Sequence, residues 1–252
     1  MIYFLIPLRS KKTSNNWEVV ENLFNNTLRS VFNQIDDNFR VIVACHEKPK
    51  LDQAYDERLE FLTADFPSPT QTSQHITDKY YKKRMLIHRA QQHGASYVMF
   101  VDADDYISNR LAGWVNGRNH PTGWFFKTGY EYNAIEDSIR VAPNFINICG
   151  TSAILNISNL DGLVNKEFTN YVRKDEYLFD FGHNEWISIL NDRKQPQLDA
   201  IPFRAAIYVL NTGENMNFVL GQRIGRFRQL YRRFIPGFKP GKKLREEFAL
   251  KL

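Results

Sequence analysis

A short apolar run that ends in a cluster of carboxylates constrains this chain more than any other feature. Tyr97–Val101 is β-branched and aromatic, follows Gly94, and leads directly into Asp102, Asp104 and Asp105. A run bounded in this way is typical of a strand buried on both faces of a sheet. Three carboxylates at its end raise one another's pKa unless a cation is present. Because open α/β sheets bind ligands at the carboxyl ends of their strands, the pattern predicts a metal-dependent site for a phosphorylated ligand.

The residues before this run alternate between strand and helix patterns. Strands are expected at 2–6, 40–44 and 59–63, and helices at 17–34 and 77–92. Such alternation predicts parallel strands joined by right-handed crossovers. We therefore expect an α/β fold with a mainly parallel central sheet flanked by helices.

The pattern changes after residue 106. Short helices are expected at 106–118 and 185–190, and strands at 124–132, 145–155 and 207–210. This change predicts one mixed domain over 1–220, composed of a nucleotide-binding half (1–106) and an acceptor half (107–220).

The last part of the chain differs in charge. Residues 222–252 hold ten Lys and Arg and two Asp and Glu, a net of +8, so the remainder carries −3 of the total of +5. Apolar residues from Leu220 to Phe234 share one helical face, and arginines occupy the rest. Residues 221–252 are predicted to be a basic amphipathic tail that binds an anionic membrane surface. Packing on the domain or binding a partner protein are alternatives, and nucleic acid is not expected because the basic charge is confined to the tail.

Composition points to a soluble protein of the cytoplasm. No apolar stretch approaches the ~20 residues of a membrane span. The N-terminus enters a strand pattern at once, so a signal peptide is not expected. Cys45 and Cys149 are expected to be reduced core residues. We expect a cytoplasmic protein that associates peripherally with the inner face of the membrane through its tail.

Several further motifs follow one another in order along the chain. They are an opening strand that ends in Ile-Pro (Ile2–Pro7), a helix LFNNTLRSVFNQ (Leu23–Gln34), the segment FVDADDY (Phe100–Tyr106), Gly150, and Asn184-Glu185-Trp186. In this order they resemble a GT-A-fold glycosyltransferase of the large family 2 type, most clearly over residues 1–106. The resemblance implies a Rossmann-like fold that transfers a sugar from a nucleotide-diphosphate donor to a glycan or lipid-linked acceptor.

The resemblance also implies roles for the acidic cluster. Asp104 would ligate Mn²⁺ or Mg²⁺, whose preference for carboxylate and phosphate oxygens suits the site. Asp102 would bind the ribose or sugar of the donor. Asp105 would be a second metal ligand or a carboxylate outside the coordination shell.

Basic and acidic residues elsewhere are candidates for the donor's nucleotide. Of the three basic residues 82–84, at most two can face the site because successive helical residues lie about 100° apart. The resemblance favours Arg84 and then Lys83. Arg9 follows the first strand and is a candidate contact for the base or the phosphates. Glu47 stands where the family has an Asp-rich turn, so it is the candidate for reading the base.

The general base has two candidates. The family is inverting and uses an Asp, and the corresponding residue here is Glu185, with Asn184 before it. His183 is the alternative base, or an additional metal ligand.

The sequence leaves two alternative functions. The first is a nucleotidyltransferase that makes a nucleotide sugar, but the first loop (Arg9–Asn16) lacks the glycines of its phosphate loop. The second is a non-catalytic protein that binds a membrane or nucleic acid through its tail. No G-x-x-x-x-G-K-[ST] motif occurs in the chain, which argues against a P-loop.

Overall fold

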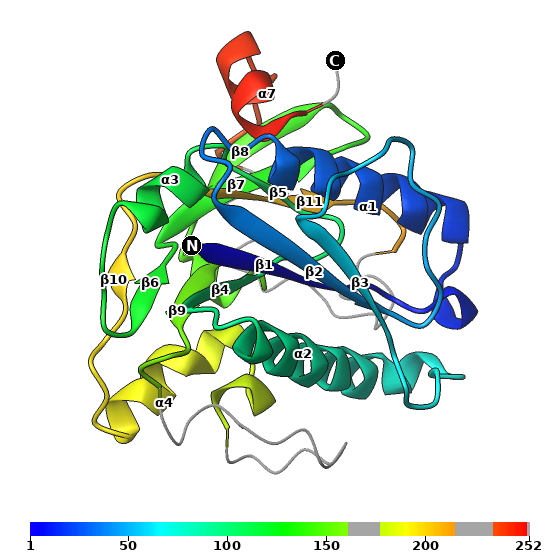
Figure 1. The fold of residues 1–252 in the computed structure, drawn as a ribbon. Helices are drawn as coiled ribbons and strands as arrows, with labels where there is room; N and C mark the ends of the chain where they lie inside the picture. Colours follow the sequence, from blue (N-terminus) through cyan, green and yellow to red (C-terminus); the bar gives the residue numbers. More distant parts are fainter. Residues whose placement is uncertain (161–176, 215–233, 251–252) are drawn as a thin grey trace.

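The computed structural model describes residues 1–160, 177–214 and 234–250 of the 252-residue chain. Its centre is a seven-stranded sheet (Figure 1). The strands are, in spatial order, β10 (Asp199–Ala200), β6 (Gly123–Phe125), β9 (Ala153–Asn156), β4 (Tyr97–Phe100), β1 (Ile2–Pro7), β2 (Phe39–Cys45) and β3 (Leu59–Thr63).

Most neighbours in this sheet are parallel. β1 pairs in parallel with β2 and β4, β2 with β3, and β10 with β6, whereas β9 is antiparallel to both β4 and β6. The residues of β1 and β4 are buried throughout, which explains their continuous apolar sequences. The predicted mixed, mainly parallel sheet is confirmed.

Helices cover both faces of this sheet (Figure 1). α1 (Trp17–Phe32) and α3 (Leu111–Asn116) pack on one face, and α2 (His75–Gln92) and α4 (Trp186–Asp192) on the other. α1 begins where the sequence indicates, because the side chain of Asn16 accepts hydrogen bonds from the N–H groups of Glu18 and Val19. α2 ends before Gly94, whose φ of +68° suits a residue without Cβ.

A second sheet of four strands adjoins the first. Its spatial order is β5 (Tyr106–Ile107), β11 (Ala206–Leu210), β7 (Thr128–Asn133) and β8 (Ser138–Pro143). Short 3₁₀ turns complete the described structure: η1 (Lys11–Thr13), η2 (Thr72–Gln74), η3 (Phe145–Asn147), η4 (Leu178–Asp180) and η5 (His183–Glu185).

The second half departs from the sequence prediction in three places. The expected helix 106–118 begins as strand β5 and becomes helical only at Leu111. The expected strand 124–132 is divided, because the chain leaves the first sheet at Phe126 and enters the second at Thr128. The expected strand 145–155 is a 3₁₀ turn followed by β9.

The described end of the chain packs on the domain. In α7 (Lys242–Phe248), Phe248 is fully buried against the second sheet, and Arg245 forms an ion pair of 2.7 Å with Asp137. Residues 242–250 are thus part of the domain, although the prediction counted them in the tail. The arginine-rich part at 215–233 lies outside the described residues, so membrane binding through it remains a prediction. None of the described helices is long and apolar enough to cross a membrane.

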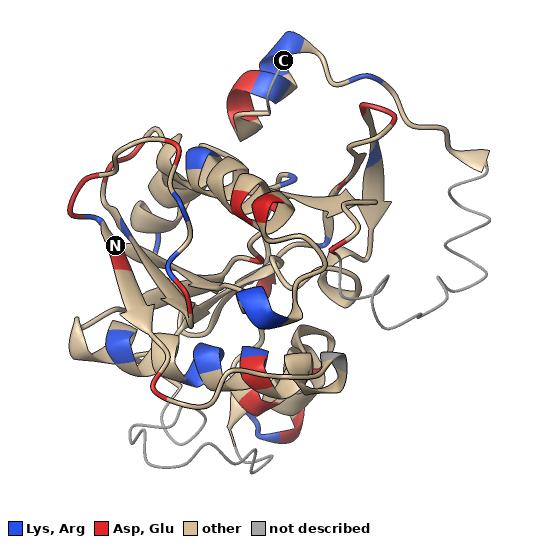
Figure 2. Cartoon of the chain, turned by 90° about the vertical axis from the view of Figure 1, so that its right-hand side faces the viewer, with Lys and Arg blue, Asp and Glu red and all other residues tan. Residues whose placement is uncertain are grey.

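Charge is mixed over the described part of the molecule. In the view of Figure 2, Lys and Arg lie beside Asp and Glu on the same helices and loops. Cys45 and Cys149 are free and buried, as predicted.

Candidate functional site

The acidic turn follows β4 at the carboxyl end of the sheet. The N–H of Val101 still donates to the carbonyl of Leu5 in β1 (2.9 Å), and the chain then turns, with the N–H of Asp105 donating to the carbonyl of Asp102 (3.0 Å). The hydroxyl of Thr151 accepts from the N–H of Asp102 (2.9 Å) and fixes the start of the turn. The predicted position of the cluster is thus observed.

Asp105 points into the protein. It is fully buried, and its oxygens accept from the Thr151 hydroxyl (2.6 Å), the Cys149 thiol (3.1 Å) and the N–H of Val209 (3.2 Å). Burial and the charge of Asp104 raise its pKa well above the ordinary value. Interior groups donate hydrogen bonds to both oxygens of Asp105, and the bond from Val209 ties the acidic turn to β11. Of the two roles that the resemblance implies for Asp105, these contacts favour a carboxylate outside the coordination shell over a second metal ligand.

Asp102 faces a lysine that the sequence analysis did not identify. Its Oδ1 lies 2.5 Å from Nζ of Lys79. Burial alone would raise the pKa of Asp102, but the charge of Lys79 brings it below the ordinary value. A Cβ on Gly150 would lie 2.6 Å from Oδ2 of Asp102, so the carboxylate occupies space that only glycine leaves open.

The electrostatics at Asp104 favour a nearby cation. Burial, followed by the charge of Asp102, raises its pKa to about 6. A divalent cation beside such a carboxylate removes the penalty for ionising it. The donor set also suits Mn²⁺ or Mg²⁺, since a hard carboxylate can share the ion with phosphate oxygens and water. Within the described ranges, no three His, Cys, Asp or Glu side chains form a metal-binding group. Asp104 would therefore hold the ion together with the ligand's own oxygens.

One face of α2 points toward this turn. His75, Lys79 and Lys83 are spaced four residues apart and so share a face. Lys83 is 5% exposed, and its Nζ lies 4.8 Å from the ring centre of Phe100 and 5.6 Å from that of Trp186. Burial and the charge of Lys79 lower its pKa to about 7. Helical spacing from Lys83 back to Lys79 is the sequence signal that could have revealed this pair.

Lys82 and Arg84, the other two basic residues of the run 82–84, form ion pairs outside the acidic turn. Nζ of Lys82 lies 2.7 Å from Oδ2 of Asp78 and donates to the carbonyl of Leu8 (2.8 Å). Arg84, the favoured candidate from the sequence, forms a buried ion pair with Asp180 at 2.5 Å. The structure therefore brings Lys83 to the site and uses Arg84 to anchor the segment that leads to η5.

The two candidate bases differ in position. His183 lies close enough to Asp102 and Lys83 for their charges to act on it, and burial, then Lys83, lower its pKa to about 4. Its imidazole is neutral at neutral pH. Glu185 is exposed, and its Oε1 accepts from the N–H of Gly182 (3.0 Å), which caps the turn. The geometry groups His183, and not Glu185, with the acidic turn.

Arg9 lies on the loop after β1, and Glu47 lies on the loop after β2. Arg9 forms an ion pair with Glu214, and its positive charge offsets a small part of the rise in the pKa of Asp104 that burial and Asp102 cause. Glu47 accepts from the N–H of Lys11 (3.0 Å) and from the hydroxyl of Ser10 (3.3 Å). Both candidates thus stay near the carboxyl ends of β1 and β2, and each shapes the loop between β1 and α1.

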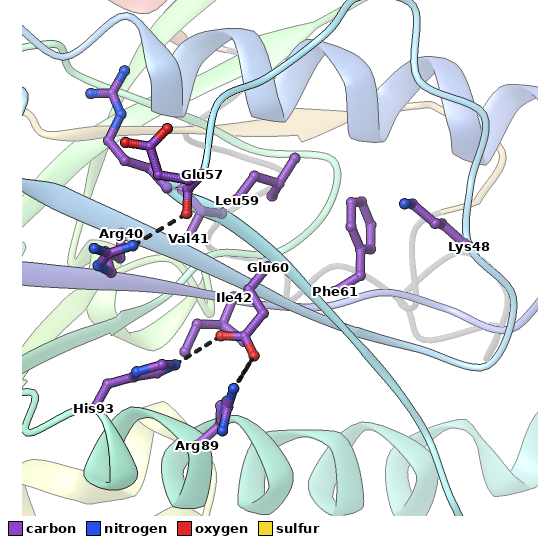
Figure 3. Close-up of a pocket in the computed structure, with 11 residues that line it drawn as sticks. Arg40, Val41, Ile42, Lys48, Glu57, Leu59, Glu60, Phe61, Arg89 and His93 are labelled. Atoms are coloured by element: carbon purple, nitrogen blue, oxygen red, sulfur yellow. Dashed lines mark hydrogen bonds and ion pairs between the residues drawn. The ribbon is translucent and has the colours of Figure 1, made fainter.

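A separate hollow of about 500 Å³ lies over β2 and β3 (Figure 3). The hollow lies near the C-terminal end of α2, whereas Lys79 lies near the N-terminal end of that helix. Three of its residues pair with one another: Glu60 binds Arg89 at 2.7 Å and His93 at 2.9 Å. The hollow shares no residue with the acidic turn, and we assign the candidate site to the turn.

Comparisons with known proteins give structural similarity only. No family model and no curated protein matches the sequence. The structure is similar to that of TarS from S. aureus. A structure of TarS residues 1–349 is 14% identical, with a TM-score of 0.42 over 82% of this chain and 60% of that one. A longer TarS structure is 13% identical, with a TM-score of 0.43 over 83% of this chain and 36% of that one. This chain thus spans less than two thirds of either.

Proposed function

We propose that the protein is a metal-dependent glycosyltransferase that moves a sugar, with inversion, from a nucleoside-diphosphate donor to a glycan or lipid-linked acceptor. The observation that carries the proposal is the acidic turn. Asp102 and Asp104 lie half-buried at the carboxyl end of β4, beside Lys79, Lys83 and a neutral His183. Carboxylates for a cation and lysines for a diphosphate are both needed to bind a nucleotide sugar.

Each residue then has a distinct task. When bound, Mn²⁺ or Mg²⁺ on Asp104 would stabilise the charge of the departing diphosphate. Asp102 would accept hydrogen bonds from donor hydroxyls, and Gly150 leaves the room it needs. Lys79 and Lys83 would attract the diphosphate electrostatically.

His183 is the proposed general base. As the acceptor oxygen attacks the anomeric carbon, the hydroxyl proton passes to the imidazole, and the bond from that carbon to the diphosphate oxygen breaks. The diphosphate leaves with the electron pair. Because the charge of Lys83 lowers the pKa of His183, an anionic donor beside Lys83 would bring that pKa back toward the range of an effective base.

The metal assignment is tested by Asp104→Asn. Titration calorimetry of UDP, GDP, ADP and CDP with Mn²⁺ should show binding of at least one of them to the wild type. Asp104→Asn should remove the Mn²⁺-dependent part of the affinity while leaving the thermal unfolding transition in place. Asp192→Asn, an exposed change at the end of α4, is the matched control and should bind normally. Equal Mn²⁺-dependent affinity in the wild type and Asp104→Asn would refute the assignment.

The base is tested by comparing two variants in a turnover assay. His183→Ala should lower kcat by about 10²–10⁴, the usual contribution of a general base. Glu185→Gln should keep most of the rate because Glu185 faces solvent. The reverse order of effects would assign the base to Glu185.

A further inference from the structure

A buried carboxylate joins the end of the second sheet to the loop after β1. Glu214 is 8% exposed and follows β11. It forms an ion pair with Arg9 and accepts from the N–H groups of Asn15 (3.2 Å) and Asn16 (2.7 Å). The guanidinium of Arg9 also donates to the backbone carbonyl of Glu214 (3.0 Å). One side chain therefore holds both ends of the loop formed by residues 9–16.

The segment that carries Glu214 is itself fixed. The N–H of Glu214 donates to the hydroxyl of Thr212 (3.2 Å), and the side-chain amide of Asn15 donates to the carbonyl of Gly213 (2.9 Å). Gly213 has a φ of +77°, which forms the bend that turns Glu214 toward the loop. Residues 212–214 and the loop 9–16 are thus joined by hydrogen bonds to the backbone of residues 213 and 214 and to the side chain of Glu214.

The loop held by Glu214 borders the candidate donor site. Its first residue, Arg9, follows the carboxyl end of β1, which pairs in parallel with β4, the strand that leads into the acidic turn. Its last residue, Asn16, caps α1. A buried ion pair often adds little net stability, because desolvating the charges offsets much of their attraction. The contacts of Glu214 do, however, fix the geometry of the groups that they join. The geometry that Glu214 fixes is the position of Arg9 beside the acidic turn.

We propose that Glu214 is a positioning residue of the donor site. It acts through Arg9 and the loop 9–16, and holds them where the nucleoside diphosphate binds. The inference rests on the proposed function. It assigns to a residue about 200 positions away in sequence the task of pre-organising the nucleotide loop.

The chain offers a matched control at the opposite end of α1. Glu247 accepts from the Ser108 hydroxyl (2.6 Å) and from the guanidinium of Arg110 (2.7 Å), and so joins α7 to the segment before α3. The neighbouring Glu246 carbonyl accepts from Asn33, which follows α1. Glu247→Gln therefore breaks a similar carboxylate–arginine contact far from the loop 9–16.

The experiment is a double-mutant cycle read by nucleotide binding. Glu214→Gln should weaken the Mn²⁺-dependent affinity for the preferred nucleoside diphosphate about tenfold and raise the donor KM similarly, with kcat at saturating donor changed less than threefold. Glu214→Asp, which keeps the charge, should restore part of the affinity and serves as the second variant if Glu214→Gln does not fold. In an Arg9→Gln background, Glu214→Gln should weaken binding less than twofold further, because the residue acts through Arg9. Glu247→Gln should lower the Tm without changing affinity.

Three results would overturn the inference. They are unchanged affinity in both Glu214 variants, independent and additive losses in the cycle, or the same loss of affinity in Glu247→Gln. If the wild type binds none of the four nucleoside diphosphates, the proposed function fails and this inference with it. If the wild type binds and Glu214→Gln binds equally well, only the role of Glu214 is refuted.

Discussion

Replacing Lys83 with methionine should stabilise the protein while weakening its activity. The folded protein lowers the pKa of Lys83 from 10.5 to about 7. At ~1.36 kcal/mol per pKa unit, holding the charged lysine in this site costs about 4–5 kcal/mol below pH 7. Methionine has a similar length and no charge, so it avoids this cost. Loss of the ring contacts with Phe100 and Trp186 offsets about 1–2 kcal/mol, leaving an expected gain of about 3 kcal/mol at pH 6.

The stability gained by Lys83→Met should decrease as the pH rises. Below pH 7, Lys83 carries its proton in the folded and the unfolded state, and the full cost applies. Between pH 7 and 10.5 the unfolded chain binds a proton that the folded protein does not, so wild-type stability rises with pH. The advantage of Lys83→Met should therefore shrink by about 2–3 kcal/mol between pH 6 and pH 9.

Urea unfolding followed by tryptophan fluorescence at pH 6, 7.5 and 9 measures both effects. Lys127→Met, at an exposed lysine between β6 and β7, is the control and should show no pH-dependent gain. Donor turnover should fall at least tenfold in Lys83→Met and stay normal in Lys127→Met. A Lys83→Met protein that is less stable than the wild type at pH 6, or equally stabilised at pH 6 and pH 9, would refute the reasoning.

Three further changes test the surroundings of the acidic turn. Gly150→Ala should keep the fold but lower donor affinity, since its Cβ would displace the carboxylate of Asp102; nucleotide titration measures this. Asp105→Asn should lower the free energy of unfolding by about 1–3 kcal/mol, as one of its hydrogen-bond donors loses its acceptor, while Mn²⁺-dependent nucleotide binding persists. Arg84→Met should destabilise by about 3–5 kcal/mol in urea unfolding because it leaves Asp180 buried without its ion pair. Normal stability of Arg84→Met, or loss of Mn²⁺-dependent binding in Asp105→Asn, would contradict these assignments.

The first half of the fold was predictable because its signals are local. The strand at 59–63 was predicted with its observed bounds, and the helix 17–34 ends only two residues earlier than expected. In the second half, short strands gain stability from partners distant in sequence, which periodicity does not reveal. The aromatic run 124–132 reads as one strand, yet its two halves belong to different sheets.

The candidate site was predictable to the extent that its residues are close in sequence. Asp102 and Asp104 follow directly from the strand that precedes them. Which of residues 82–84 faces the acidic turn depends on how α2 is rotated about its own axis. The strands that α2 packs against set this rotation. The contact of Lys79 with Asp102 was accessible from helical spacing, whereas that of Arg9 with Glu214 joins residues about 200 positions apart, beyond the reach of local patterns.

Three groups of the candidate site have shifted pKa values that a metal–diphosphate complex would counteract. Asp104 is held above its ordinary pKa, and Lys83 and His183 below theirs, in each case with burial as the largest cause. A divalent cation would favour the charged form of Asp104, and an anionic diphosphate would favour the charged forms of Lys83 and His183. The cation alone would favour only the charged form of Asp104, and the diphosphate alone only those of Lys83 and His183. A metal–diphosphate complex would favour the charged forms of all three. Mn²⁺ and a nucleoside diphosphate should therefore raise the Tm more together than the sum of their separate effects, and simple additivity of the two would argue against a shared site.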